Sequence, residues 1–293
     1  MSKKKDKTKK TYVAIVLDKS GSMASTKEQT IQGYNEQVQQ IRKNAKDQEV
    51  FVSLVTFNSD VIEHLWNEPA DKLQEANPAD YVPDGTTAMR DAIGYTVQKL
   101  TKTAEKDANV AFLVIIISDG EENASQHISK SVLKELIDGR QSQGNWTFTY
   151  MGCSEEVVRK VAQETSIPIA NMAVWENRTA KGTRRAMKRT GENVANYLNA
   201  RVIRGASATS NFHSTEDLCC ANYTSEPGDA SVAPPTIPTF VPPILGGTPA
   251  PNFRNILGLQ TSLGDVQPIV VNVNNPQSAA GYFSTGNSVK WEG

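Results

Sequence analysis

Two unbroken apolar runs, at residues 12–17 and 112–117, each lead directly into a polar turn that contains an aspartate. Short runs without alternation of polar and apolar residues are typical of strands covered on both faces, as in parallel sheets. In open α/β sheets, ligands bind in the crevice outside the carboxyl ends of such strands. The pattern therefore predicts a mostly parallel sheet with polar side chains gathered at one edge.

Strand and helix patterns alternate along residues 11–204, as expected for strands joined by helical crossovers. Strands are predicted at residues 12–17, 50–57, 61–66, 110–117, 146–151 and 172–174. Helices are predicted from residue 27 to about 45, at 89–100, 128–137 and 155–164, and from 179 to about 200. The hairpin signal Asn58-Ser59-Asp60 makes one edge strand antiparallel. We expect an α/β, doubly wound fold with a mostly parallel six-stranded sheet.

The first polar turn, at residues 18–23, directs three oxygen-bearing side chains toward one point. Asp18, Ser20 and Ser22 stand at positions i, i+2 and i+4 on a turn that contains Gly21. Hard oxygen donors of this kind suit Mg²⁺, Mn²⁺ or Ca²⁺ rather than zinc. The same residue types also form ordinary turns and helix caps, so this turn alone does not establish a metal site.

Two distant segments supply the same chemistry. Thr86 and Thr87 follow Gly85 immediately before a helical pattern, and Asp119 follows the second buried run. All three loops are expected at the same edge of the sheet, where the strands end. One oxygen-lined site therefore explains them better than three unrelated turns.

These three parts, in this order, resemble the metal-ion-dependent adhesion site of the von Willebrand factor A family, over roughly residues 11–200. Asp18, Ser20 and Ser22 match the Asp-x-Ser-x-Ser part of the family pattern, and Asp119 matches its last aspartate. Alignment of residues 88–93 with the family's helix start favours Thr87 as the threonine, with Thr86 as the alternative. The resemblance implies an intact site for Mg²⁺, or for Mn²⁺ or Ca²⁺.

The resemblance also implies a function in protein–protein interaction. One coordination position of the metal is expected to face outward and to accept an Asp or Glu carboxylate from a protein partner. Glu121 and Glu122, directly after Asp119, are expected on the rim, where they would repel badly aligned acidic partners. A closed metal that only holds the three loops together is the alternative. No enzymatic activity is expected.

Two other classes of function compete with this interpretation. Asp18, at the end of the first predicted strand, has the position of the nucleophile in an aspartyl-phosphate phosphatase. Such enzymes, however, have a second carboxylate where this chain has Ser20. His64 and His127 lie outside the three loops, and His213 lies in the C-terminal tail. The other class is a structural or assembly component, for example of a phage or secretion particle, with a tail that threads between subunits.

Charge, hydropathy and cysteine content indicate which classes of partner and which cellular setting to expect. The net charge of −1 argues against binding to nucleic acid, and the basic residues 181–189 lack interleaved aromatic side chains that would stack on bases. No run approaches the ~20 apolar residues needed to span a bilayer. The three cysteines, two of them adjacent, indicate neither a disulfide framework nor a metal cluster, so we expect a reducing, cytoplasmic setting.

The two ends of the chain differ in composition from the middle. Residues 1–10 carry six Lys against one Asp and are predicted to form a basic, disordered N-terminus. Ten of the fourteen prolines lie beyond residue 226, so residues 205–293 are predicted to form a largely disordered tail with short docking segments, such as residues 266–273. The folded domain is accordingly assigned to residues 11–204. The sequence does not indicate an oligomeric state.

Overall fold

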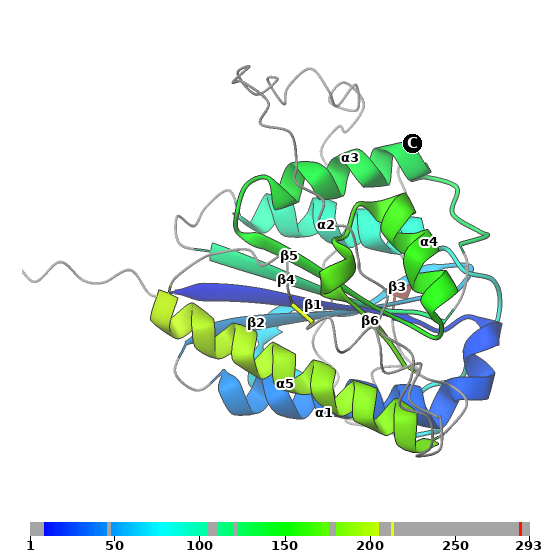
Figure 1. Cartoon of the computed structure of the whole chain (residues 1–293), viewed down its shortest axis with the longest axis horizontal. Helices are drawn as coiled ribbons and strands as arrows, with labels where there is room; N and C mark the ends of the chain where they lie inside the picture. Colours follow the sequence, from blue (N-terminus) through cyan, green and yellow to red (C-terminus); the bar gives the residue numbers. More distant parts are fainter. Residues whose placement is uncertain are drawn as a thin grey trace, which may run out of the picture. The chain divides into compact units, whose positions relative to one another are not determined.

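A sheet runs through the centre of the structure, a computed structural model that describes residues 9–45, 48–104, 110–119, 122–175, 180–204, 212–213 and 287–288 (Figure 1). Its strands are β1 Lys10–Asp18, β2 Glu49–Phe57, β3 Val61–Pro69, β4 Val110–Ile117, β5 Trp146–Gly152, β6 Met172–Val174 and β7 Asn287–Ser288, in the order β6-β5-β4-β1-β2-β3-β7. All pairs are parallel except β2 with β3 and β3 with β7. The predicted six-stranded, mostly parallel sheet is confirmed, and the two-residue β7 adds to it beside β3.

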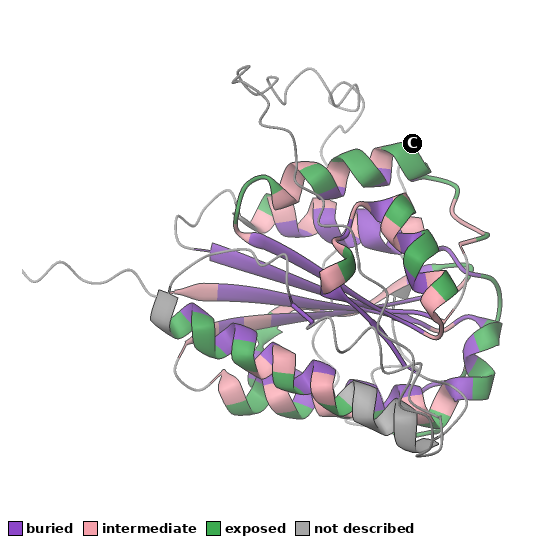
Figure 2. Cartoon of the chain, viewed as in Figure 1, coloured by how far each residue is buried: buried purple, intermediate pink, exposed green. Residues whose placement is uncertain are grey.

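The two central strands explain why the sequence shows unbroken apolar runs. Every residue of β4 is buried, and β1 is buried from Thr11 onward. Figure 2 shows the buried residues concentrated in these strands and on the inner sides of the helices. Because helices cover both faces of the sheet, neither strand has a solvent-facing side that would require alternate polar residues.

The helices lie in two layers on the two faces of the sheet. They are α1 Lys27–Asn44, α2 Met89–Ala104, α3 Lys130–Gln141, α4 Glu155–Thr165 and α5 Ala180–Arg204. In Figure 1, α1 and α5 pack together on one face, and α2, α3 and α4 cover the other. This is the doubly wound arrangement that the alternating pattern predicts. Within the described ranges, no helix is both long and apolar enough to cross a membrane.

One predicted helix begins later than its apolar pattern indicates. The prediction places its start at Ile128, but α3 starts at Lys130, and Ser129 caps it by accepting a hydrogen bond from the Val132 backbone N at 3.3 Å. The Ile128 N–H instead donates to Asp91 Oδ1 at 2.7 Å. Ile128 is buried, so its apolar side chain belongs to the packed loop before the helix.

Phe212 and His213, which the sequence analysis assigns to the tail, pack against the domain. The Phe212 N–H donates to Asn171 Oδ1 at 2.7 Å, and the His213 ring nitrogens lie 2.9 Å from Thr149 Oγ1 and 3.0 Å from Asn193 Nδ2. Both residues are buried. These two residues of the predicted tail therefore dock on the domain; two isolated residues that dock through hydrogen bonds leave no periodic signal in the sequence.

Other expectations about the two ends concern residues outside the described ranges. These are the disorder predicted for residues 1–10, apart from the described Lys9 and from Lys10, which begins β1; the disorder of residues 205–293, apart from the two short described segments; and the docking segment at 266–273.

Candidate metal centre

Two neighbouring parallel strands bring the first and third loops together. In the register of β1 and β4, Leu17 lies opposite Ile117, so both strands end at the same level. Asp18, the last residue of β1, therefore lies beside Ser118, whose hydroxyl donates a hydrogen bond to Asp18 Oδ2. This is the carboxyl edge of the sheet at which the sequence predicts the site.

The carboxylate of Asp18 holds the first loop by hydrogen bonds. The Ser20 N–H donates to Asp18 Oδ1 at 2.7 Å, and the Ser20 and Ser22 hydroxyl oxygens lie 3.1 Å apart. Gly21 lies against the second loop: its N–H donates to the Gly85 carbonyl oxygen at 3.0 Å, and a Cβ at this position would lie 3.3 Å from that oxygen. Glycine thus permits the close approach of the two loops.

Asp119 completes a connected set of four predicted ligands. The Ser22 hydroxyl donates to Asp119 Oδ1 at 2.8 Å, which links the third loop to the first. Asp18 and Ser20 are buried, Asp119 is half-buried and Ser22 is exposed, so the set reaches from the interior to the surface. The structure therefore brings together Asp18, Ser20, Ser22 and Asp119, as the sequence predicts.

The two candidate threonines occupy different environments. Thr86 is exposed, and its hydroxyl oxygen lies 2.9 Å from that of Ser59 in the turn between β2 and β3. Thr87 is buried, and its N–H donates to Asn123 Oδ1, in the segment that follows Asp119, at 2.8 Å. Among the described residues, Thr87 is thus bonded to the segment after Asp119 and Thr86 to the turn at Ser59, while the choice of Thr87 as the fifth oxygen donor stays a prediction.

Burial changes the acidity of both carboxylates. It raises the pKa of Asp18 to about 6, although hydrogen bonds from Ser118 and Ser20 partly oppose the rise. Burial also raises the pKa of Asp119, and the hydrogen bond from Ser22 opposes it. A buried and a half-buried carboxylate that lie close together and have raised pKa values form a place where a cation would be stabilised.

The donor set fits a hard divalent cation. Two carboxylates and hydroxyl oxygens are the ligand types that Mg²⁺ and Mn²⁺ take in proteins. Among the described residues, no group of three or more His, Cys, Asp or Glu side chains is placed to hold a metal ion. The candidate site therefore depends on hydroxyl oxygens as well as carboxylates.

Three residues that support the site are absent from the sequence prediction. Tyr81 donates its hydroxyl hydrogen bond to the Asp18 carbonyl oxygen, Ser118 bonds the Asp18 carboxylate, and Asn123 bonds Thr87. Ser118 stands directly before Asp119, so a signal for it is present in the sequence. Tyr81 is 63 positions from Asp18 and carries no local signal.

The expectation that Glu122 lies on the rim is wrong. Only 3% of its side chain is exposed, and its carboxylate accepts hydrogen bonds from the backbone N–H groups of Ala124 and Ser125 at 2.9 and 2.7 Å. A carboxylate can be buried where backbone N–H groups donate hydrogen bonds to it. The path of the loop determines where these groups lie, and the residue type does not. Glu121 lies outside the described residues.

Comparison with known proteins gives one family and several similar folds. The family model described as "von Willebrand factor type A domain" matches residues 13–181, which is more than half of the chain. No curated protein sequence matches significantly.

Among solved structures, the pilus adhesin SpaC from Lactobacillus rhamnosus GG is 12% identical, with a TM-score of 0.50, over 66% of this chain and 31% of that one. A von Willebrand factor type A protein from Catenulispora acidiphila is 14% identical, with a TM-score of 0.45, over 64% and 43%. The manganese-loaded TRAP protein of Plasmodium vivax is 21% identical, with a TM-score of 0.38, over 49% and 57%.

The chain thus spans less than two thirds of each of these three solved chains. The likeness to the adhesin, at this level of identity, supports a shared fold. The match of the family model agrees with the sheet order, the two helical layers and the three loops at the carboxyl edge. The chain belongs to the von Willebrand factor type A domain family.

Proposed function

We propose that this chain is a metal-dependent protein-interaction module that binds an Asp or Glu carboxylate of a protein partner. Asp18, Ser20, Ser22, Thr87 and Asp119 would hold the cation, Mg²⁺ or Mn²⁺. The observation that carries the proposal is the hydrogen-bonded chain from buried Asp18 to exposed Ser22, because it connects the interior carboxylate to the surface.

The charges of these side chains favour an acidic ligand. Asp18 and Asp119 contribute two negative charges when ionised, and the serine and threonine hydroxyls contribute none. A divalent cation bound there would supply a coordination position that remains attractive to a further carboxylate. The pilus adhesin SpaC shares the fold, so the fold is one that an adhesin also uses.

A phosphatase-like reaction has less support from the site. The second carboxylate of such an enzyme acts as a general acid two residues after the nucleophile. At that position, the hydroxyl oxygen of Ser20 lies 3.1 Å from the Ser22 hydroxyl, and a serine hydroxyl is not an acid at neutral pH. Asp18 therefore has no proton donor of this kind beside it in the loop.

Capture of a partner should require both the cation and Thr87. We expect the full-length chain, immobilised in millimolar Mg²⁺, to retain a partner from native lysate and to release it in EDTA. Thr87→Ala should abolish retention because it removes a predicted oxygen donor. The measurement is quantitative mass spectrometry of the retained proteins.

Thr86→Ala is the matched control for this experiment. It makes the same substitution at the adjacent threonine, whose hydroxyl hydrogen-bonds to that of Ser59. It should leave retention unchanged. Capture that persists in EDTA and in Thr87→Ala would contradict the proposal. The alternative, a structural or assembly role, would then be favoured.

Metal affinity should fall on acidification. Burial raises the pKa of Asp18 to about 6, so below this pH a cation must displace a proton from the carboxylate. We expect Mg²⁺ binding, measured by calorimetry, to weaken about tenfold between pH 7 and pH 5. The reason is that pH 5 lies one unit below the pKa of Asp18, where most of its carboxylate is protonated. An affinity that does not change over this range would contradict the assignment of Asp18.

The stability of the metal-free chain should change in the opposite direction. Because the pKa of Asp18 in the folded chain lies above its ordinary value of 3.8, the folded state binds more protons than the unfolded state between these two values. The contribution of Asp18 to stability therefore rises as the pH falls through about 6 toward 3.8.

A further inference from the structure

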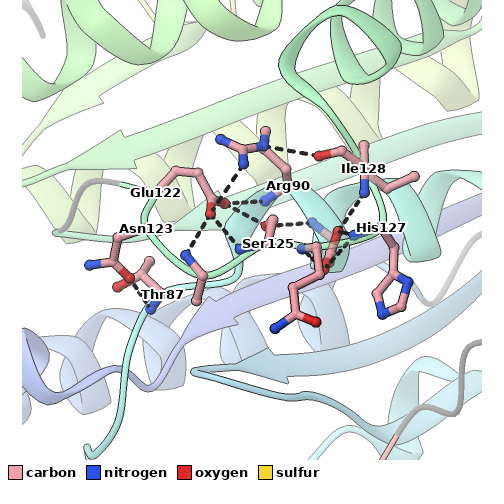
Figure 3. Close-up of polar contacts among 10 residues, drawn as sticks. Thr87, Arg90, Glu122, Asn123, Ser125, His127 and Ile128 are labelled. Carbon is pink, nitrogen blue, oxygen red and sulfur yellow. Dashed lines mark hydrogen bonds and ion pairs between the residues drawn. The ribbon is translucent and has the colours of Figure 1, made fainter.

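The segment after the third loop is held by a buried carboxylate (Figure 3). Glu122 accepts hydrogen bonds from the N–H groups of Ala124 and Ser125, from the Ser125 hydroxyl at 2.7 Å, and from the Arg90 N–H at 2.8 Å. The Arg90 guanidinium lies 3.7 Å from the same carboxylate. Since Arg90 is the second residue of α2, Glu122 fixes this segment to the start of that helix.

A second carboxylate fixes the end of the same segment. Asp91, also in the first turn of α2, accepts hydrogen bonds from the three successive N–H groups of Gln126, His127 and Ile128, at 2.9, 3.1 and 2.7 Å. Asp91 is 4% exposed. Hydrogen bonds from N–H groups to an ionised carboxylate are stronger than those between neutral groups, so both ends of the segment are firmly held.

Thr87 is bound from both sides by the segment held in this way. Its N–H donates to Asn123 Oδ1 at 2.8 Å, and its carbonyl oxygen accepts from the N–H groups of Asn123 and Ala124 at 3.0 and 3.1 Å. Figure 3 shows Asn123 and Thr87 facing one another beside Glu122. Hydrogen bonds to Asn123 and Ala124 therefore hold both polar groups of the Thr87 backbone.

We propose that Asn123 is a positioning residue for Thr87, and that Asn123 and Glu122 together set the preference of the metal centre for Mg²⁺ over Ca²⁺. This inference rests on the proposed function, because it requires a cation at Thr87. Mg²⁺ requires near-ideal octahedral geometry, whereas Ca²⁺ accepts six to eight ligands in flexible arrangements. A loosened Thr87 therefore weakens Mg²⁺ binding more than Ca²⁺ binding.

The test is calorimetric titration of the full-length chain with Mg²⁺ and with Ca²⁺ at pH 7.5. In Asn123→Ala, the affinity for Mg²⁺ should fall about tenfold, the lower end of the range for residues that support metal ligands, and the affinity for Ca²⁺ should fall less. The ratio of the two affinities is the readout, because general destabilisation lowers both affinities together. Asn123→Asp keeps an oxygen acceptor for the Thr87 N–H and should restore the ratio.

Asn35→Ala is the matched control. Asn35 on α1 also holds the backbone of another residue: its side chain accepts from the Ala76 N–H at 2.8 Å, as Asn123 does from Thr87, and donates to the Ala76 carbonyl oxygen at 2.9 Å. Ala76 lies outside the three loops, so the ratio should not change in this variant. An unchanged ratio in Asn123→Ala, or an equal change in Asn35→Ala, would overturn the inference.

Two further results complete the design. If Asn123→Ala does not fold, Glu122→Gln takes its place. Its amide oxygen can still accept from the N–H groups of Ala124 and Ser125, which share one carboxylate oxygen of Glu122, but its NH₂ replaces the oxygen that accepts from the Arg90 N–H and cannot accept. This variant should lower the ratio as well, and an unchanged ratio would again overturn the inference. If the wild-type chain binds neither cation, or binds both equally well after Asp18→Ala, the proposed function itself fails. That outcome differs from one in which the wild-type chain binds the cations at Asp18 but the ratio of affinities does not change in Asn123→Ala, which overturns this inference alone.

Discussion

Mg²⁺ at one hundred times its dissociation constant is expected to raise the free energy of unfolding by about 2.7 kcal/mol, and Asp18→Ala is expected to remove the whole increase. A ligand that binds only the folded state stabilises it by mass action, and Asp18 links the interior end of the donor set to Ser20 and Ser118. Urea denaturation with and without Mg²⁺, for both proteins, measures the effect.

Asp84→Ala is the control for this comparison. Asp84 belongs to the second loop, is exposed, and accepts a hydrogen bond from Asn58 Nδ2 at 2.7 Å, but it is not a predicted ligand. Its removal should leave the increase with Mg²⁺ intact. An increase that survives in Asp18→Ala would place the cation elsewhere in the molecule.

Phe212→Ala should lower the free energy of unfolding by about 3 kcal/mol. Phe212 is 7% exposed and packs in the hydrophobic core with Tyr197, their ring centroids 6.2 Å apart. Truncation of a buried phenylalanine removes its transfer free energy and leaves a cavity, which costs about 3–5 kcal/mol in well-packed cores. The measurement is urea denaturation of the full-length variant.

Val202→Ala serves as the control for Phe212, because Val202 is also apolar and lies near the end of the last helix but is 38% exposed. It should change stability by less than about 0.5 kcal/mol. If Phe212→Ala is as stable as the wild type, the packing of residues 212–213 contributes nothing to the domain.

Much of the fold could be predicted because its signals are local. The strand predicted at residues 110–117 coincides with β4, and the strand predicted at 172–174 coincides with β6. Both are strands in which burial on two faces leaves a continuous apolar pattern. The start of α3 was predicted two residues early because Ile128 is apolar for a reason of loop packing, which periodicity alone does not distinguish from a helix face.

The site divides in the same way. Asp18, Ser20, Ser22 and Asp119 could be predicted because residue spacing within a turn, and the shared edge of parallel strands, bring them together. Whether they hold a cation stays a prediction. The inward turn of Glu122 could not be predicted, because its partners are backbone N–H groups whose positions depend on the path of the loop.

By itself, the sequence determined the alternation of strands and helices, the parallel sheet and the polar residues at the strand ends, since each follows from periodicity or composition over a few residues. Only the tertiary structure showed that Thr86 and Thr87 have different partners, placed Phe212 and His213 against the domain, and joined Asn123 to Thr87. These outcomes depend on contacts between residues 20 to 64 positions apart. The packing of the whole chain determines which partner such a residue contacts, so no local sequence pattern predicts it.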